Sequence, residues 1–169
     1  IKTSKLIGCD TVKFQFHIAE EETTQYAKSP SYFKGEDRYS YFERIAFTKE
    51  QWITLREEAD NHDINFLVSP FSVQAVDILD SIGVVYYKIA SGEVTNLPLI
   101  KRLNRSNFRV VVSSGMSNWD ELQQAAKLLT DVKQLTILQC TSEYPCPLSK
   151  IGLNVINEIR KNVSTDRVG

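Results

Sequence analysis

The sequence predicts an α/β protein in which parallel strands alternate with helices. Five short runs rich in β-branched and aromatic residues are separated by amphipathic segments. Most of these runs are almost continuously apolar, as are strands covered on both faces of a parallel sheet. From the second run onward the centres recur at intervals of roughly 20 to 27 residues, the spacing of successive βα units. The expected strands span residues 11–16, 64–69, 85–90, 108–113 and 135–140.

Helix-start signals lie between these strands. Thr48 with Gln51 three residues later forms one capping box, and Ser117 with Asp120 forms a second. Ser149 is expected to cap the last helix. An open doubly wound sheet and a stretch of an eight-stranded barrel both fit this order of elements, and the periodicity does not separate them.

The composition indicates one globular domain without a strong overall charge. The 169 residues are 42% hydrophobic, and 20 Lys+Arg against 21 Asp+Glu give a net charge of -1, so no global field favours nucleic acid or an acidic membrane. No apolar run reaches the roughly 20 residues of a membrane span, and no signal-peptide pattern is visible. The three cysteines lack CxxC spacing, which indicates reduced thiols. We therefore expect a cytoplasmic protein.

One long irregular region, residues 18–46, interrupts the pattern. It is acidic at residues 20–22 and then rich in aromatic residues. A loop of this length inside a compact domain is more often a functional flap than a passive connection.

Polar residues gather at the carboxyl ends of the expected strands, where α/β folds build their sites. Lys13, Gln15 and His17 alternate along the first strand and therefore share one face. An unpaired ammonium inside an apolar strand is costly, and a bound anion would explain both Lys13 and Lys88. These features predict a pocket for a phosphate and a carboxylate. The other strand ends carry Lys88, Ser91, Glu93, Ser113, Ser142 and Tyr144.

Each of these residues also has a purely structural explanation. The serines could satisfy loop amides, Glu93 could cap a helix that begins near Thr95, and Tyr144 could pack its own loop. Neither His17 nor His62 has a second ligand at useful spacing, so both are expected to be ordinary surface or loop histidines.

Five strings in register resemble the sialic acid synthase family, which also includes legionaminic and pseudaminic acid synthases and spore-coat polysaccharide synthases. The resemblance implies a partial (β/α)8 barrel of the TIM type, about five parallel strands with helices outside. Residues 1–169 would be an incomplete catalytic barrel that holds the family's strands 2 to 6 and the opening of strand 7. The family's small antifreeze-like C-terminal domain would be absent. The strings are VKFQ (12–15), SPF (69–71), YKIASGE (87–93), SSGM (113–116) and QCTSEYP (139–145).

Family members condense phosphoenolpyruvate with an N-acetylated amino sugar such as N-acetylmannosamine and release phosphate. The resemblance implies catalytic roles for Glu93 and Lys88, and sugar contacts for Gln15, Glu93 and Tyr144. Ser142 stands where some family members carry asparagine. The phosphoenolpyruvate ligands implied by the resemblance are Lys13, Lys88, Ser91, Ser113 and Ser142.

The family enzyme also uses a divalent metal, manganese or magnesium, which polarises the sugar aldehyde. Its two histidine ligands lie on the seventh and eighth strand segments, and neither His17 nor His62 aligns with them. No metal ligand is therefore assigned in this chain, and we expect the chain alone to lack synthase turnover. The resemblance implies a homodimer for the complete parent, and unclosed strand edges would favour dimerisation or strand exchange.

Two other functions fit the same residues. In a Schiff-base aldolase, Lys88 would attack a keto acid, although a second lysine and several serines suit a phosphate better. Alternatively, the chain is a non-catalytic truncated barrel that self-associates. The sugar and the nonulosonic acid product cannot be read from residues 18–45, the loop that would touch the sugar.

Overall fold

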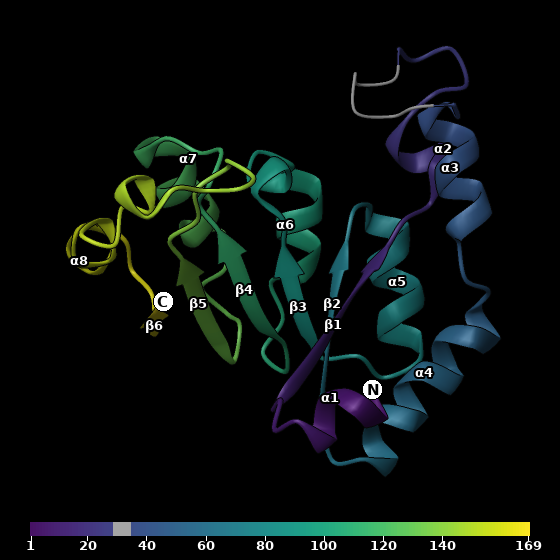
Figure 1. Cartoon of the computed structure of the whole chain (residues 1–169). Helices are drawn as coiled ribbons and strands as arrows, with labels where there is room; N and C mark the ends of the chain where they lie inside the picture. Colours follow the sequence, from purple (N-terminus) through teal and green to yellow (C-terminus); the bar gives the residue numbers. More distant parts are fainter. Residues whose placement is uncertain (29–34) are drawn as a thin grey trace. The chain divides into compact units, whose positions relative to one another are not determined.

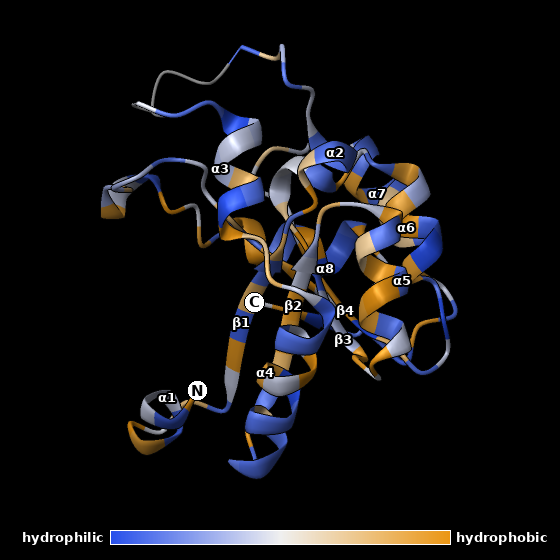
Figure 2. Cartoon of the chain, turned by 90° about the vertical axis from the view of Figure 1, so that its right-hand side faces the viewer, coloured by the Kyte–Doolittle hydropathy of each residue, from blue (hydrophilic) through white to orange (hydrophobic). Residues whose placement is uncertain are grey.

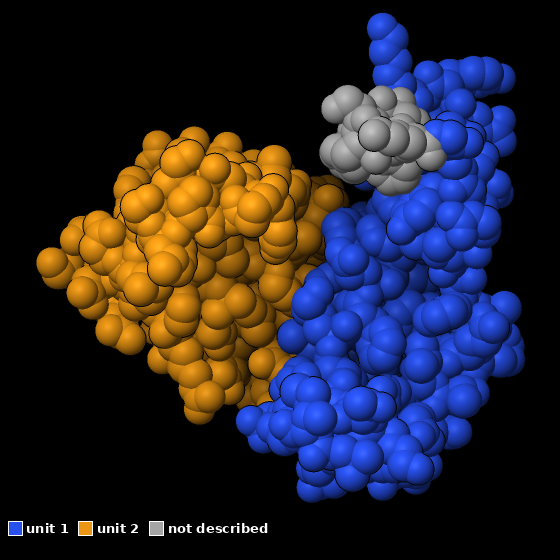
Figure 3. Space-filling view, viewed as in Figure 1, with its two compact units in different colours: residues 1–84 blue, residues 85–169 orange. Residues whose placement is uncertain are grey.

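The computed structural model describes residues 1–28 and 35–169 of the chain (Figure 1). Its contacts divide the chain into two compact units, unit 1 (residues 1–84) and unit 2 (residues 85–169), where the sequence predicts one (Figure 3). Within each unit the paired strands are parallel, which confirms the predicted α/β class.

Unit 1 is built around one parallel pair of strands, whose register runs from Thr11 opposite Asn65 to Phe16 opposite Pro70. Two of its helices, α4 and α5, pack against β2. The predicted capping box of α4 is confirmed, because Gln51 N donates to Thr48 Oγ1 and Thr48 N donates to Gln51 Oε1. The elements are α1 (Lys2–Leu6), β1 (Thr11–Phe16), α2 (Ala19–Glu22), α3 (Arg38–Ile45), α4 (Lys49–Asn61), β2 (Asn65–Pro70) and α5 (Val73–Ser81).

Trp52 of α4 lies at the centre of an aromatic cluster in unit 1. Its side chain is 2% exposed and stacks on Phe16 with 4.7 Å between ring centroids. Phe14, Phe47 and Phe66 meet the indole edge-on, at 6.2, 5.8 and 6.3 Å. These contacts take up the apolar face of β1, so the alternate residues of that strand must face the other way.

The described part of the region expected to be irregular, residues 18–46, contains two helices. They are α2 and α3, which contact each other. Asp37 caps α3 by accepting from Ser40 N at 2.9 Å. The part of the expected flap at residues 29–34 lies outside the described residues.

Unit 2 holds four strands paired in chain order, β3 with β4, β4 with β5 and β5 with β6. Val110, Val111 and Val112 of β4 are all buried, as expected for a strand covered on both faces. The elements are β3 (Tyr86–Ile89), η1 (Ser91–Glu93), α6 (Leu97–Leu103), β4 (Arg109–Ser113), α7 (Trp119–Lys127), β5 (Gln134–Leu138), η2 (Leu148–Lys150), α8 (Val155–Asn162) and β6 (Arg167–Val168).

The start of α7 lies one residue later than the sequence predicts. Asn118, not Ser117, is the N-cap, and its capping box closes on Glu121 rather than on Asp120. Trp119 is therefore the first residue of the helix and remains 42% exposed.

The last helix also begins later than expected. Ser149 lies inside the short 3-10 helix η2, and α8 begins only at Val155, after Asn154. Gly152, whose φ is +70°, separates the two helices, because a left-handed residue cannot continue a right-handed helix.

Among the described residues, no helix is both long enough and apolar enough to cross a membrane. Figure 2 illustrates the point, because α5 is strongly apolar but has only nine residues, and the longer α4 is mainly hydrophilic.

Candidate functional site

Gly115 is the point at which three strand ends of unit 2 converge. It lies two residues beyond β4, and a Cβ added there would be 2.8 Å from Ser142 Oγ and 3.0 Å from Ser91 Oγ. Ser91 follows β3 and Ser142 follows β5. The structure therefore brings together two of the predicted phosphoenolpyruvate ligands, around a residue with no side chain.

Ser113 is the last residue of β4 and contributes a buried hydroxyl. The residue is 2% exposed, and within residues 1–28 and 35–169 its Oγ has no hydrogen-bond partner. It therefore does not satisfy a loop amide, which was its alternative explanation. Leaving a buried hydroxyl unpaired costs about 1–3 kcal/mol, so a ligand oxygen at this position would be stabilised.

Lys88 lies on the same face of the sheet as Ser113. Lys88 pairs with Val111 in the β3–β4 register, and Ser113 lies two residues further along β4. Paired residues of parallel strands, and residues two apart along a strand, point to one face. Lys88 is half-buried.

Lys13 and Gln15 belong to unit 1, where both are exposed on β1. The premise that Lys13 is embedded in an apolar strand is therefore wrong. Its neighbours Val12 and Phe14 face the opposite side of the strand, and an exposed ammonium needs no anion to offset burial. The two residues do share a face of β1, as predicted.

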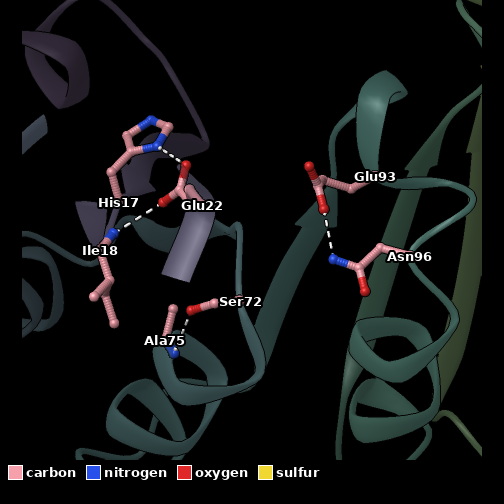
Figure 4. Close-up of polar contacts among 7 residues, drawn as sticks. All are labelled: His17, Ile18, Glu22, Ser72, Ala75, Glu93 and Asn96. Carbon is pink, nitrogen blue, oxygen red and sulfur yellow. Dashed lines mark hydrogen bonds and ion pairs between the residues drawn. The ribbon is translucent and has the colours of Figure 1, made fainter. Parts of the chain in front are cut away.

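The carboxylate of Glu93 is held by a neighbouring amide (Figure 4). Asn96 Nδ2 donates to Glu93 Oε2 at 2.8 Å, and Asn96 Oδ1 accepts from Leu99 N at 3.3 Å. The alternative explanation of Glu93, that it caps a helix near Thr95, does not hold, because Asn96 caps α6. Asn96, the N-cap of α6, therefore also orients the carboxylate of Glu93.

Tyr144 is 99% exposed and is joined to Pro145 by a cis peptide bond. It does not pack its own loop, which was its structural alternative. Beside it, Glu143 forms an ion pair with Lys150 Nζ at 3.1 Å, which connects the loop after β5 to η2. The sugar contact expected of Tyr144 stays a prediction.

His17 lies in the loop between β1 and α2, as the sequence suggests, but its side chain is not on the surface. Its ring is stacked between Phe42 and Phe71, with 4.2 Å between centroids on each side. Figure 4 shows its Nδ1 atom, which lies 2.8 Å from Glu22 Oε2. The side chains of His17 and Glu22 are 12% and 4% exposed. Glu22 Oε1 also accepts from Ile18 N at 2.9 Å. The nearest sequence signal was the acidic run that ends at Glu22.

In the part of the chain that the structure describes, no cluster of three or more His, Cys, Asp or Glu side chains could hold a metal ion.

The fold and the site define an α/β protein of the TIM-barrel type with polar strand ends. The chain is similar in structure to an N-acetylneuraminic acid synthetase from Leptospira borgpetersenii, with a TM-score of 0.77 and 23% identity over 94% of this chain and 53% of that one. The predicted barrel-type fold is confirmed. The chain belongs to the NeuB family, whose model matches residues 1–169.

Two curated relatives show the same relationship at the level of sequence. The chain is 30% identical to an N,N'-diacetyllegionaminic acid synthase from Campylobacter jejuni, covering 94% of this chain and 50% of that protein. It is 31% identical to a pseudaminic acid synthase from Helicobacter pylori, covering 96% and 52%. The chain thus spans about half the length of the curated relatives it matches.

Proposed function

We propose that this chain is part of a synthase that condenses phosphoenolpyruvate with an N-acetylated amino sugar such as N-acetylmannosamine and releases phosphate. Membership of the NeuB family supports the reaction class. The observation that carries the proposal to this chain is the unpartnered buried hydroxyl of Ser113, on the same face as Lys88 and two residues before the convergence at Gly115.

In this proposal the cationic and hydroxyl groups bind the trianionic substrate. Lys88, with Lys13, supplies positive charge, and the serine hydroxyls donate to phosphate and carboxylate oxygens. Charge-assisted hydrogen bonds of this kind are about twice as strong as neutral ones. The hydroxyl donors are Ser91, Ser113 and Ser142, and the hydrogen of Ser142 must turn from the carbonyl of Gly115 to the ligand.

The chemistry then needs a carbon nucleophile, a proton and a water molecule. The enolpyruvate carbon attacks the sugar aldehyde, water adds to the resulting cation, and phosphate leaves with cleavage of its C–O bond. Glu93 is assigned to proton transfer or to holding the sugar, and Gln15 and Tyr144 to sugar contacts. The contact from Asn96 holds one oxygen of Glu93 and so fixes the direction of the carboxylate.

The divalent metal that the family implies has no assigned ligands here. The described residues contain no cluster of three or more His, Cys, Asp or Glu side chains that could hold a metal ion, and no step above passes through one. A cytoplasmic location and a homodimer complete the proposal, and both rest on the sequence and the family resemblance.

The proposal is tested by titrating this chain with phosphoenolpyruvate and following binding by 31P NMR and calorimetry. Lys88→Met is expected to weaken binding at least about tenfold, which corresponds to 1.4 kcal/mol. The matched control is Lys133→Met. Lys133 lies just before the amino end of β5, whereas the candidate site lies at the carboxyl ends of the strands. Equal affinities for the two variants would overturn the role of Lys88.

The aldolase alternative gives a different result in the same preparation. Borohydride reduction with pyruvate would leave a covalent adduct on Lys88 if this lysine formed a Schiff base. The synthase proposal predicts no adduct.

A further inference from the structure

A hydrogen-bonded bridge between Ser114 and Gln139 joins the ends of β4 and β5 beside the candidate site. Ser114 Oγ donates to Gln139 Oε1 at 3.4 Å and accepts from Cys140 N at the same distance. Gln139 Nε2 donates to the carbonyl of Ile151 at 3.1 Å, and Thr141 Oγ1 donates to that carbonyl at 3.0 Å. One glutamine side chain thus links the β4 loop to the segment after η2.

The bridge is adjacent in sequence to the candidate phosphate-binding groups. Ser114 lies between Ser113, with its unpaired buried hydroxyl, and Gly115, whose carbonyl accepts from Ser142 Oγ at 2.8 Å. A rotation of the chain at Ser114 would therefore displace the groups on both sides of it.

The bridge is only partly enclosed by packing. A cavity of about 370 Å³ borders both Ser114 and Gln139 and continues to Trp119 and Ile159. On that side the two side chains lack close contacts, so their hydrogen bonds, each contributing about 0.5–1.5 kcal/mol, help to hold them. On another side, a Cβ at Gly152 would be only 3.1 Å from Gln139 Nε2, so the backbone approaches the amide closely.

We propose that Gln139 is a positioning residue that acts through Ser114 to set the spacing of the hydroxyls of Ser113 and Ser142 for phosphate. The inference rests on the proposed function and adds to it a residue that contacts no substrate. An amide is required because position 139 must accept from Ser114 and donate to Ile151 at the same time. A carboxylate would lose the donor and place a negative charge beside the anion site.

The test measures phosphoenolpyruvate affinity and thermal stability for Gln139→Leu, Gln139→Glu and Ser114→Ala. We expect affinity to fall about fivefold for Gln139→Leu and at least about twentyfold for Gln139→Glu, with melting temperatures close to that of the parent. The double variant of Ser114→Ala and Gln139→Leu should bind no more weakly than the weaker single variant, because both changes break one bridge. The matched control is Gln134→Leu, at the opposite end of β5.

The possible results separate this inference from the proposed function. If the parent binds phosphoenolpyruvate and the Gln139 variants bind it equally well, or if they lose stability without losing affinity, the positioning role is overturned and the proposed function stands. If the losses of affinity in Ser114→Ala and Gln139→Leu add in the double variant, the hydrogen bond between the two side chains is not the cause of those losses. If the parent binds neither phosphoenolpyruvate nor inorganic phosphate, the proposed function fails and the positioning role fails with it.

Discussion

Ser142 donates its hydroxyl hydrogen to the carbonyl oxygen of Gly115 over 2.8 Å, and a Cβ on Gly115 would lie only 2.8 Å from the same Oγ. The hydrogen bond and the missing side chain are therefore two aspects of one close approach between the loops after β4 and β5. Gly115 is not one of the described glycines with a positive φ. What position 115 requires is space, not a left-handed backbone.

Replacing Gly115 by alanine should therefore damage the candidate site. The added methyl group would push apart the hydroxyls of Ser91 and Ser142, and we expect phosphoenolpyruvate affinity to fall at least about tenfold. Calorimetric titration measures the effect. Gly92→Ala is the matched control, because a Cβ at Gly92 meets nothing within 4 Å. Similar losses in the two variants would contradict the steric explanation.

The pair formed by His17 and Glu22 should stabilise unit 1. His17→Phe keeps a ring between Phe42 and Phe71 but removes the partner of a carboxylate that is 4% exposed, so the free energy of unfolding should fall by about 2–3 kcal/mol. Glu22→Gln should cost less, because a neutral amide is easier to bury. Urea denaturation followed by circular dichroism gives these values.

A second histidine in the chain supplies the control for that experiment. His62 pairs with Glu58 at 2.9 Å, but both side chains are substantially exposed. Exposed ion pairs contribute only about 0–1 kcal/mol. If His62→Phe destabilised the chain as much as His17→Phe, burial of the Glu22 carboxylate would not be the cause.

Asn96 should contribute to stability mainly as the cap of α6. Asn96→Ala removes the acceptor for Leu99 N and should lower the free energy of unfolding by about 1 kcal/mol. Asn96→Ser retains a cap but cannot reach Glu93 in the same way, so it should cost less than half as much. Thermal unfolding distinguishes the two. Equal losses would mean that the contact with Glu93, rather than the cap, carries the effect.

The start of α3 should be sensitive to acid. The side-chain hydrogen bond from Ser40 holds the pKa of Asp37 below its ordinary value, and the one from Arg44 does the same for Glu36. Because these folded-state pKa values are lowered, the stabilisation is complete above the unfolded-state values and is lost as the pH falls through the folded-state values. We expect the cap to weaken on acidification below about pH 4.

Amide hydrogen exchange at Ser40 as a function of pH measures this loss. In Asp37→Asn the neutral side chain can still cap the helix, so protection at Ser40 should vary much less with pH. An unchanged acid dependence in that variant would assign the effect to groups other than Asp37.

The sequence predicted the strands well because their signal is local. Residues 11–16 form β1 as expected, and the other four predicted strands differ from the observed ones by one or two residues at their ends. Helices without an apolar stripe were missed. The helix α1 buries no residue and has no side-chain cap, so no periodic pattern marks it. At α7, Ser117 and Asn118 are both good caps with an acidic residue three positions later, and the sequence alone does not choose between them.

The positions of site residues could be predicted where strand ends fix them. They could not be predicted where they depend on contacts between residues far apart in the sequence. The convergence of Ser91 and Ser142 follows from their positions after parallel strands. The burial of Lys13 was wrongly inferred, because the face of β1 that it shares with Gln15 was taken to be covered and is exposed. The environment of His17 could not be predicted, since it is made by Phe42 and Phe71, which lie 25 and 54 residues further along the chain.

The chain's two tryptophans fall one in each compact unit, Trp52 in the aromatic cluster of unit 1 and Trp119 at the start of α7 in unit 2. Because Trp52 is 2% exposed and Trp119 is 42% exposed, their fluorescence should differ in emission wavelength and in quenching by acrylamide. The unmodified protein therefore contains a separate optical probe for each half, so that a single denaturation experiment can reveal whether the halves melt in one transition or in two.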